Sequence, residues 1–378
     1  MKKREAGFEL LRIISMMMIV MLHLLGKDHG GVLEKTRAFS AAWVVTWGLE
    51  ALCTAAVNCY VLISGYFLVG SRESEDLNAD GRPVRSPWRK VLELCLTVWF
   101  YTGSLFLIGY AFGWVGISKS SLLHLVTPIT GRTYWFVSVY LGLLLLSPYL
   151  NKLIKSLTER AHRRLIVGLI ALFSLLPTVL PVYDTFQSGR GIGLAWFAVL
   201  YLIAAYVRLY GFGGFWRKLE GWRTKHWTLA YLAVTALILL SKLVITAATE
   251  KLFGHSAGTS ILYQYHSPAC LVSAGCLFLA FREMRLPGEK PLGRIAAALA
   301  PLMLGVYLIH ENPSIRGKLW ELLSPGAEGS VFLLVLKLFG IVIGITAVCA
   351  GIEWVRQRVF ALFRRSDDRS EEAPAGEG

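Results

Sequence analysis

Residues 7–25 read GFELLRIISMMMIVMLHLL, an apolar run that contains only three ionisable side chains. A membrane-spanning helix needs about 20 predominantly apolar residues, and this run nearly reaches that length. Although basic residues precede it, the run lacks a small-x-small cleavage site and continues directly into Lys27, Asp28 and His29. We therefore interpret it as a retained first transmembrane helix rather than as a cleaved signal peptide.

The composition extends this interpretation to the whole chain. Of its 378 residues, 55% are hydrophobic and 17% are charged, whereas soluble domains average about 25% charged residues. Mean hydropathy is +0.53. These values exclude a disordered protein, a disulfide-stapled secreted domain and an ordinary cytosolic enzyme. The six cysteines lie in apolar runs without a CxxC pair, so we expect buried thiols rather than disulfides or zinc ligands.

Ten apolar runs are candidate membrane spans, which predicts an all-α, polytopic helical membrane protein. They cover about 8–25, 46–69, 91–113, 134–150, 165–183, 192–210, 227–248, 260–281, 295–311 and 331–355. The ninth run is short and contains Pro301. We expect residues 1–363 to form a single transmembrane domain. Residues 364–378 are polar and acidic at their end, which predicts a disordered cytoplasmic tail.

The distribution of basic residues supports the count of ten spans. If the N-terminus is cytoplasmic, 27 of the 39 lysines and arginines fall in inner segments and nine in outer loops. Every inner segment after the first is richer in these residues than the outer loops beside it, and the first equals its neighbour, a bias that agrees with the positive-inside rule. We therefore expect both termini to be cytoplasmic and the membrane to be the plasma (inner) membrane. The net charge of +14 is explained by these loops, so we expect no nucleic acid partner.

The ionisable residues of the first span require a reason, because each costs about 2.5–3.5 kcal/mol near the centre of a membrane helix. His23 follows Arg12 by eleven positions. At 100° and 1.5 Å per residue, both side chains lie on one face, roughly 16 Å apart along the axis. Glu9, one turn before Arg12, is placed to offset its charge. A structural Arg–Glu pair with an unrelated histidine is the alternative; the shared face favours a functional pair.

Two further groups of residues lie near the predicted outer surface. His310 ends the ninth span, one turn after Tyr307, and we place it at the same end of the bundle as His23. A histidine that is simply satisfied at a helix end is the alternative. Before the fourth span, Trp135 belongs to an aromatic cluster that is typical of an interfacial belt and is equally suited to stacking on a sugar.

Several short motifs extend from the first to the ninth predicted span. They are Glu9-x-x-Arg12 with ten residues between Arg12 and His23, Ser64-Gly65-Tyr66-Phe67, Arg89-Lys90, Trp135-Phe136 with Tyr140 and Pro148, and Tyr307-Leu308-Ile309-His310. Together they resemble acyltransferase family 3, the integral-membrane acyltransferases that modify surface polysaccharides and related glycans. The Arg-x10-His pattern is fairly specific, and the other motifs are individually weak.

The resemblance implies transfer of an acyl group, most simply acetyl, from an acyl-coenzyme A donor to a hydroxyl of a cell-envelope glycan or lipid-linked sugar. His23 then acts as base or transient acyl carrier, and Arg12 binds the donor, since guanidinium suits oxyanions. We assign substrate binding to a further set of residues: Glu9, Arg89, Trp135, Tyr140, Tyr307 and His310. We expect acyl-coenzyme A to be the co-substrate and membrane lipids to surround the protein. We expect no metal cofactor.

Two readings from other classes remain open. A transporter or flippase for a polysaccharide or lipid-linked sugar also suits ten spans with buried charges, and it would use Arg12 and His23 for gating or proton coupling. A non-catalytic membrane anchor or sensor would tolerate substitution of both residues. An acyltransferase consumes a thioester donor, whereas a transporter or an anchor does not, so this measurement distinguishes the enzyme from both alternatives.

Overall fold

A computed structural model of the chain describes residues 5–69, 87–131, 133–180, 189–212, 218–326 and 329–371, and this part of the chain contains helices and no strands. In chain order the helices are α1 (Ala6–Leu25), α2 (Ala41–Cys53), α3 (Ala55–Leu68), α4 (Pro87–Ala111), α5 (Lys119–Val126), α6 (Trp135–Ser156), α7 (Glu159–Ile170), α8 (Leu176–Val179), α9 (Leu194–Tyr210), α10 (Thr224–Phe253), α11 (Pro268–Arg282), α12 (Pro291–Leu299), α13 (Met303–His310), α14 (Pro313–Leu323) and α15 (Val331–Glu371).

The helices correspond to the ten predicted spans. Within the described residues, eight helical segments are long and apolar enough to cross a membrane. The other two predicted spans overlap α9, with 17 residues, and α11, with 15 residues. The chain is therefore an all-helical membrane protein, as predicted. The count of ten crossings and the cytoplasmic position of both termini stay predictions.

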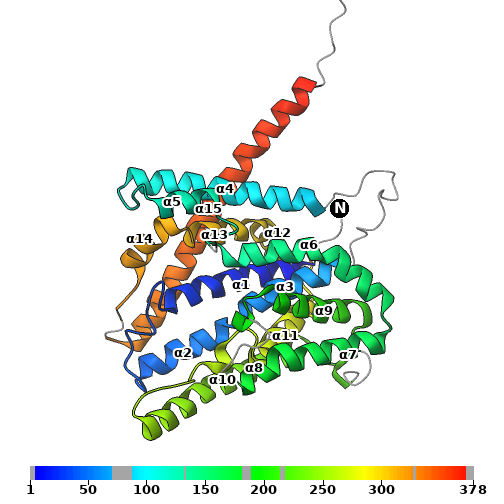
Figure 1. Cartoon of the computed structure of the whole chain (residues 1–378), viewed down its shortest axis with the longest axis vertical. Helices are drawn as coiled ribbons and strands as arrows, with labels where there is room; N and C mark the ends of the chain where they lie inside the picture. Colours follow the sequence, from blue (N-terminus) through cyan, green and yellow to red (C-terminus); the bar gives the residue numbers. More distant parts are fainter. Residues whose placement is uncertain are drawn as a thin grey trace, which may run out of the picture.

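Helix α1 lies inside the bundle and is surrounded by its neighbours. It contacts α2, α3, α11, α12, α13 and α15, and Figure 1 shows it between α4 on one side and α10 on the other. Phe8, Leu11, Val20 and Leu24 are fully buried or nearly so. The helix that carries the ionisable side chains is thus enclosed by protein rather than exposed to lipid.

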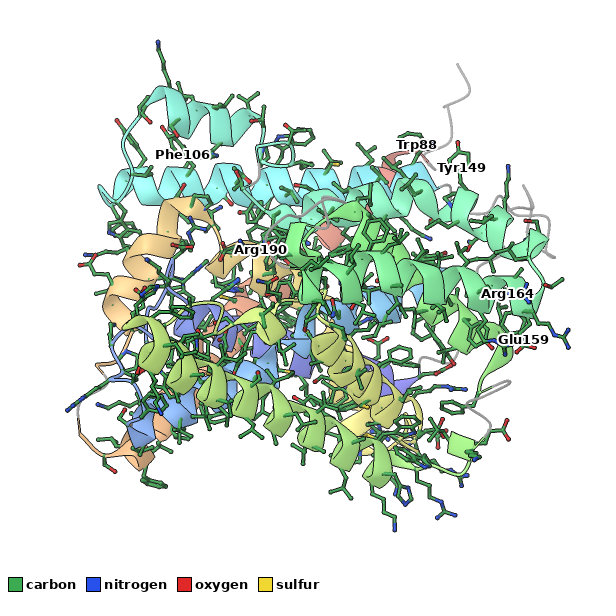
Figure 2. The ribbon with its side chains drawn as sticks, turned by 60° about the horizontal axis from the view of Figure 1, so that its bottom comes forward. Trp88, Phe106, Tyr149, Glu159, Arg164 and Arg190 are labelled. Carbon is green, nitrogen blue, oxygen red and sulfur yellow. The ribbon has the colours of Figure 1, made fainter. Side chains whose placement is uncertain are left out.

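The outer helices present apolar side chains to their surroundings. Leu229 on α10 is 65% exposed and Phe332 on α15 is 76% exposed. Figure 2 shows Trp88 of α4 and Tyr149 of α6 on the outer surface, and Glu159 at the end of the bundle where α7 begins. An apolar belt around a bundle with charged ends is the surface that a bilayer requires.

The ninth predicted span is broken at its proline. A short 3-10 turn, Ala300–Leu302, separates α12 from α13 and contains Pro301. Proline has no backbone N–H to donate and its ring clashes with the preceding turn, so a regular helix does not continue through it. The 3-10 turn joins α12 to α13, and both helices pack against α1, while α13 also packs against α15.

Helix α15 continues to Glu371 and extends beyond the bundle (Figure 1), whereas the sequence predicts a disordered tail from residue 364; residues 372–378 lie outside the described part.

Glu353 of α15 is a buried carboxylate near the end of the last predicted span, only 2% exposed. Arg356 donates two hydrogen bonds of 2.7 Å to its carboxylate, and Tyr101 donates another.

Gly65 allows α3 and α9 to approach closely. A Cβ atom at this position would lie 2.9 Å from the Cα of Tyr201 and 3.1 Å from the Cβ of Ala204. Contacts of that length require the two backbones to move apart. Small residues commonly have this role where membrane helices pack.

We predict that Gly65→Ala destabilises the protein by about 1–3 kcal/mol, because the added methyl group overpacks the α3–α9 contact. Gly275→Ala on α11 is the matched control, since a Cβ there meets no atom within 4 Å. It should be neutral or stabilising by up to about 1 kcal/mol through helix propensity. Thermal unfolding of both variants in one detergent gives the comparison. Equal midpoints for the two variants would show that Gly65 does not set this helix distance.

Candidate active site

A cavity of about 400 Å³ runs along one face of α1, between this helix and α3, α6 and α13. Its α1 wall is formed by Glu9, Arg12, Met16, Ile19, Leu22 and His23, most of which are spaced three or four residues apart. This spacing is that of one face of an α-helix. Arg12 and His23 therefore line the same cavity, one near each end of α1.

At the Arg12 end, a carboxylate and a guanidinium form an ion pair. Arg12 donates through Nη1 to Oε1 of Glu9 over 2.9 Å. The hydroxyl of Tyr60 donates to the carbonyl oxygen of Arg12 over 2.6 Å, which links α3 to this turn of α1. The Arg12 side chain keeps 30% of its surface exposed, against 8% for Glu9. Arg12 is thus held in place and still accessible from the cavity.

At the other end, hydrogen bonds define which nitrogen of His23 carries the proton. Nδ1 of His310 lies 2.6 Å from the carbonyl oxygen of Val306. A carbonyl oxygen can only accept, so this nitrogen donates, and Nε2 of neutral His310 must be an acceptor. Nδ1 of His23 lies 2.9 Å from that Nε2. His23 therefore donates through Nδ1, and its Nε2 is left with an unshared electron pair.

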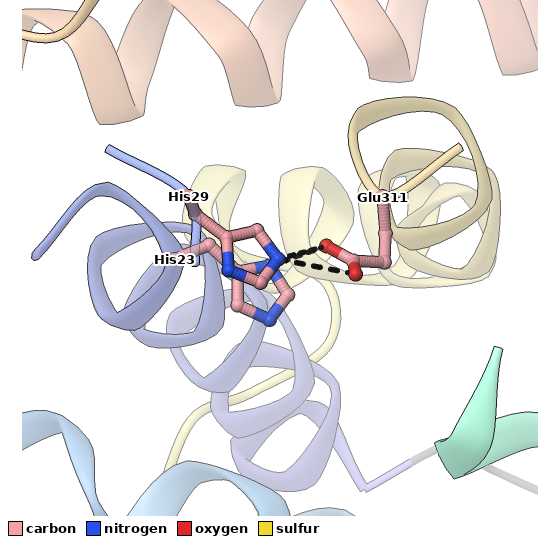
Figure 3. Close-up of side chains that lie close together, drawn as sticks. All are labelled: His23, His29 and Glu311. Carbon is pink, nitrogen blue, oxygen red and sulfur yellow. Dashed lines mark hydrogen bonds and ion pairs between the residues drawn. The ribbon is translucent and has the colours of Figure 1, made fainter. Parts of the chain in front are cut away.

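Glu311 brings a carboxylate to the same group of rings (Figure 3). His29 donates through Nε2 to Oε2 of Glu311 over 2.8 Å, and Nδ1 of His23 lies 3.2 Å from the same oxygen. Arg316 donates to Oε1 over 2.7 Å. Burial alone would raise the pKa of Glu311, but the hydrogen bond from His29 and the nearby positive charges lower it to about 2. Glu311 is therefore a fixed anion at physiological pH.

Aromatic side chains form the wall of the cavity opposite α1. Trp135, Phe136 and Tyr140 come from the first turns of α6, and Tyr307 comes from α13. The rings of Phe136 and Tyr140 are stacked 5.8 Å apart, and Phe136 meets Tyr307 edge to face at 6.1 Å. Tyr307 is 5% exposed. This wall offers flat apolar surfaces to whatever enters.

The structure brings together most of the residues that the sequence singled out. Six line the cavity: Glu9, Arg12, His23, Trp135, Tyr140 and Tyr307. His310 is fully buried and contacts His23 directly. Arg89 lies apart from them, because its side chain is 61% exposed on α4 and pairs with Glu93 at 3.4 Å. Its placement gives no support to a role in this cavity.

Two members of the site were missed by the sequence analysis. His29 follows the first predicted span by a few residues, and Glu311 is the last residue of the ninth; neither was included among the predicted site residues. A usable signal was present in the sequence: each lies within six residues of a histidine that we had singled out. The close approach of the two loops, which only the fold reveals, makes them part of the site.

A comparison with protein families agrees with the resemblance that the sequence motifs indicate. A family model described as an acyltransferase domain matches residues 5–354, nearly the whole chain. The protein thus falls in the class of membrane acyltransferases, and the chain belongs to the acyltransferase 3 family, as its motifs predicted. No curated protein and no solved structure matches it.

We predict that neutral His23 is protonated at Nδ1 and bare at Nε2, because Nδ1 faces two acceptors, His310 and Glu311. Nitrogen-15 NMR of histidine-labelled protein in lipid distinguishes the two tautomers, and the His23→Gln variant identifies the signal. A His23 signal with the proton on Nε2 would contradict the hydrogen-bond assignment. Labelled His255, which is exposed and contacts only the Phe253 carbonyl among the hydrogen bonds described, serves as internal reference.

Proposed function

We propose that this protein transfers an acyl group, most simply acetyl, from acyl-coenzyme A to a hydroxyl of a cell-envelope glycan or lipid-linked sugar. One observation carries the proposal: a single cavity joins a guanidinium at one end to an unprotonated imidazole nitrogen at the other. Acyl transfer from a thioester needs both a base for the alcohol and a cation for an anionic donor.

The donor would enter at the Arg12 end. The exposed part of the guanidinium is suited to a phosphate or carbonyl oxygen of coenzyme A, to which it can bind in a bidentate manner. The cavity beyond it is lined by Met16 and Ile19, which suit a largely apolar arm. With the positive-inside orientation, this end faces the cytoplasm, where acyl-coenzyme A is made.

The transfer itself would take place at His23. Its Nε2 accepts the proton of the acceptor hydroxyl, and the hydroxyl oxygen attacks the thioester carbonyl. The tetrahedral intermediate then expels the thiolate of coenzyme A, which takes the proton back from His23 as the carbon–sulfur bond breaks. While the ring is cationic, ionised Glu311 at 3.2 Å from Nδ1 stabilises it. An acyl-imidazole on Nε2 is the second route compatible with the same geometry.

The acceptor would approach the His23 end from the outer side of the plasma membrane. Trp135 and Tyr307 can stack on the apolar face of a sugar ring there, as aromatic side chains commonly do in small-molecule sites. Tyr140, whose hydroxyl lies 3.3 Å from that of Ser64, would contact a substrate nearer the Arg12 end. Glu9 keeps Arg12 oriented at the far end. In this arrangement neither substrate has to cross the bundle.

We predict that His23→Ala lowers kcat by at least about 10²-fold, since it removes the base. Arg12→Ala should mainly raise KM for acyl-coenzyme A, because it removes a contact to the donor. The assay follows thioester consumption and labelled acetyl transfer to a panel of envelope glycans, with purified protein in liposomes. His255→Ala is the matched control for loss of an imidazole and should keep wild-type rates.

Full transfer by His23→Ala would overturn the proposed mechanism. Movement of a glycan across the liposome without thioester consumption by the wild type would replace the enzyme with the transporter. Both measurements use the same preparation, so a failure of insertion is recognised by size-exclusion chromatography of each variant.

We also predict that Ile19→Trp blocks the passage between the two ends. Ile19 lines the cavity between Arg12 and His23 and is 7% exposed. An indole there displaces the donor from His23, and we expect kcat/KM to fall by roughly 10²-fold. Met18→Trp on the same helix is the control, because Met18 does not line the cavity and is half-buried. Equal activity of the two variants would show that the donor takes another path.

A further inference from the structure

The His23 end holds more ligating side chains than acyl transfer requires. We call His23, His29, His310 and Glu311 the His/Glu cluster. The ligating atoms of His23, His29 and Glu311 all lie within 4.8 Å of one another. Nε2 of His310 lies 2.9 Å from Nδ1 of His23. We propose that the His/Glu cluster binds a divalent transition metal such as Zn²⁺, and that the bound metal and the active state of His23 exclude each other.

The donor set fits this class of cation. Imidazole nitrogens suit Zn²⁺, Cu²⁺, Ni²⁺ and Fe²⁺, and a carboxylate oxygen commonly completes such a site. Mg²⁺ and Ca²⁺ prefer oxygen ligands, of which the cluster offers one carboxylate. Two imidazoles and one carboxylate, with His310 beside His23, thus favour a transition metal over the alkaline-earth cations.

The distances require only small movements. Around a tetrahedral Zn²⁺ with bonds of about 2.0–2.1 Å, ligand atoms lie roughly 3.3 Å apart. In the structure, Oε2 of Glu311 is 2.8 Å from Nε2 of His29 and 3.2 Å from Nδ1 of His23. A metal ion would replace these hydrogen bonds as the ligand atoms separate by a few tenths of an ångström.

Two of the ligands are already oriented by partners outside the cluster. The Val306 carbonyl accepts from Nδ1 of His310, which leaves Nε2 of that ring directed at His23. Arg316 holds Oε1 of Glu311 at 2.7 Å and leaves Oε2 toward the histidines. Such outer contacts fix the tautomer and direction of metal ligands. Arg316 is also a nearby positive charge, so we expect reversible binding that a chelator removes.

An ion can reach the cluster. The side chains of His23 and His29 keep 18% and 17% of their surface exposed. Their rings are stacked, with centroids 4.5 Å apart and planes within 6° of parallel. His29 lies in the segment between α1 and α2, outside the helices, and its ring faces that of His23.

Metal binding would change which nitrogen of the His23 ring carries the proton. A metal on Nδ1 displaces the proton from that nitrogen, and the neutral ring then carries it on Nε2. Nε2 is the atom that the proposed function uses as base. This part of the inference rests on the proposed function, whereas binding by the His/Glu cluster does not.

Binding is tested first, without reference to activity. Full-length protein in detergent, stripped with EDTA and dialysed, is titrated with Co²⁺ while its visible absorption is recorded, and Zn²⁺ then displaces the Co²⁺. We expect one ion per chain. His29→Ala and Glu311→Gln should each weaken binding by roughly 10–100-fold. His255→Ala is the control and should bind as the wild type does.

Several results would overturn the site. They are absence of Co²⁺ bands in the wild type, unchanged binding by both cluster variants, or an equal loss in His255→Ala. His29→Ala alters a residue outside the helices, so it keeps the test valid if Glu311→Gln is not monodisperse.

Exclusion between metal and activity is tested by titrating Zn²⁺ into the acyl transfer assay. We expect inhibition that EDTA reverses, with a midpoint that follows the Zn²⁺ affinity found by Co²⁺ displacement. Stimulation by Zn²⁺, or full activity of the loaded protein, would overturn the exclusion. An inactive metal-free wild type that still binds Co²⁺ would instead count against the proposed function alone.

Discussion

Placing a glutamate, an arginine and a histidine on one membrane helix constrains the architecture of the whole protein. In hydrocarbon these groups have no water to solvate them, and each must find a partner within the protein. Glu9 and Arg12 satisfy each other, and His23 is satisfied by α13. α1 can lie in a bilayer only because six other helices contact it. The apolar outer helices serve to separate this polar face from lipid.

The segment that follows Pro301 supplies the partners that meet that constraint. The 3-10 turn Ala300–Leu302 joins α12 to α13, and α13 packs against α1. His310 at the end of α13 meets His23, and Glu311 follows at the helix end with its pairing partner Arg316 further along the chain. One short helix thus provides both polar contacts of His23.

Much of this arrangement could be predicted from the sequence, for physical reasons. Bilayer thickness fixes the length of apolar runs, and helix geometry fixes the angle between Arg12 and His23. Both features can therefore be derived from residue positions along the sequence alone. His29 and Glu311 were not predicted, because the path of a loop depends on tertiary contacts. Arg89 was chosen from a motif, and a motif does not specify side-chain direction; the side chain points outward beside Glu93.

The chain of hydrogen bonds from His23 through His310 ends at the carbonyl oxygen of Val306. A peptide carbonyl is not a base, so a proton taken up at His23 cannot leave along this chain. Along this branch the proton therefore has no exit, and it leaves Nδ1 of His310 in place. Such a branch is a closed terminus for protons, which suits the loan of a proton at His23 within a reaction cycle.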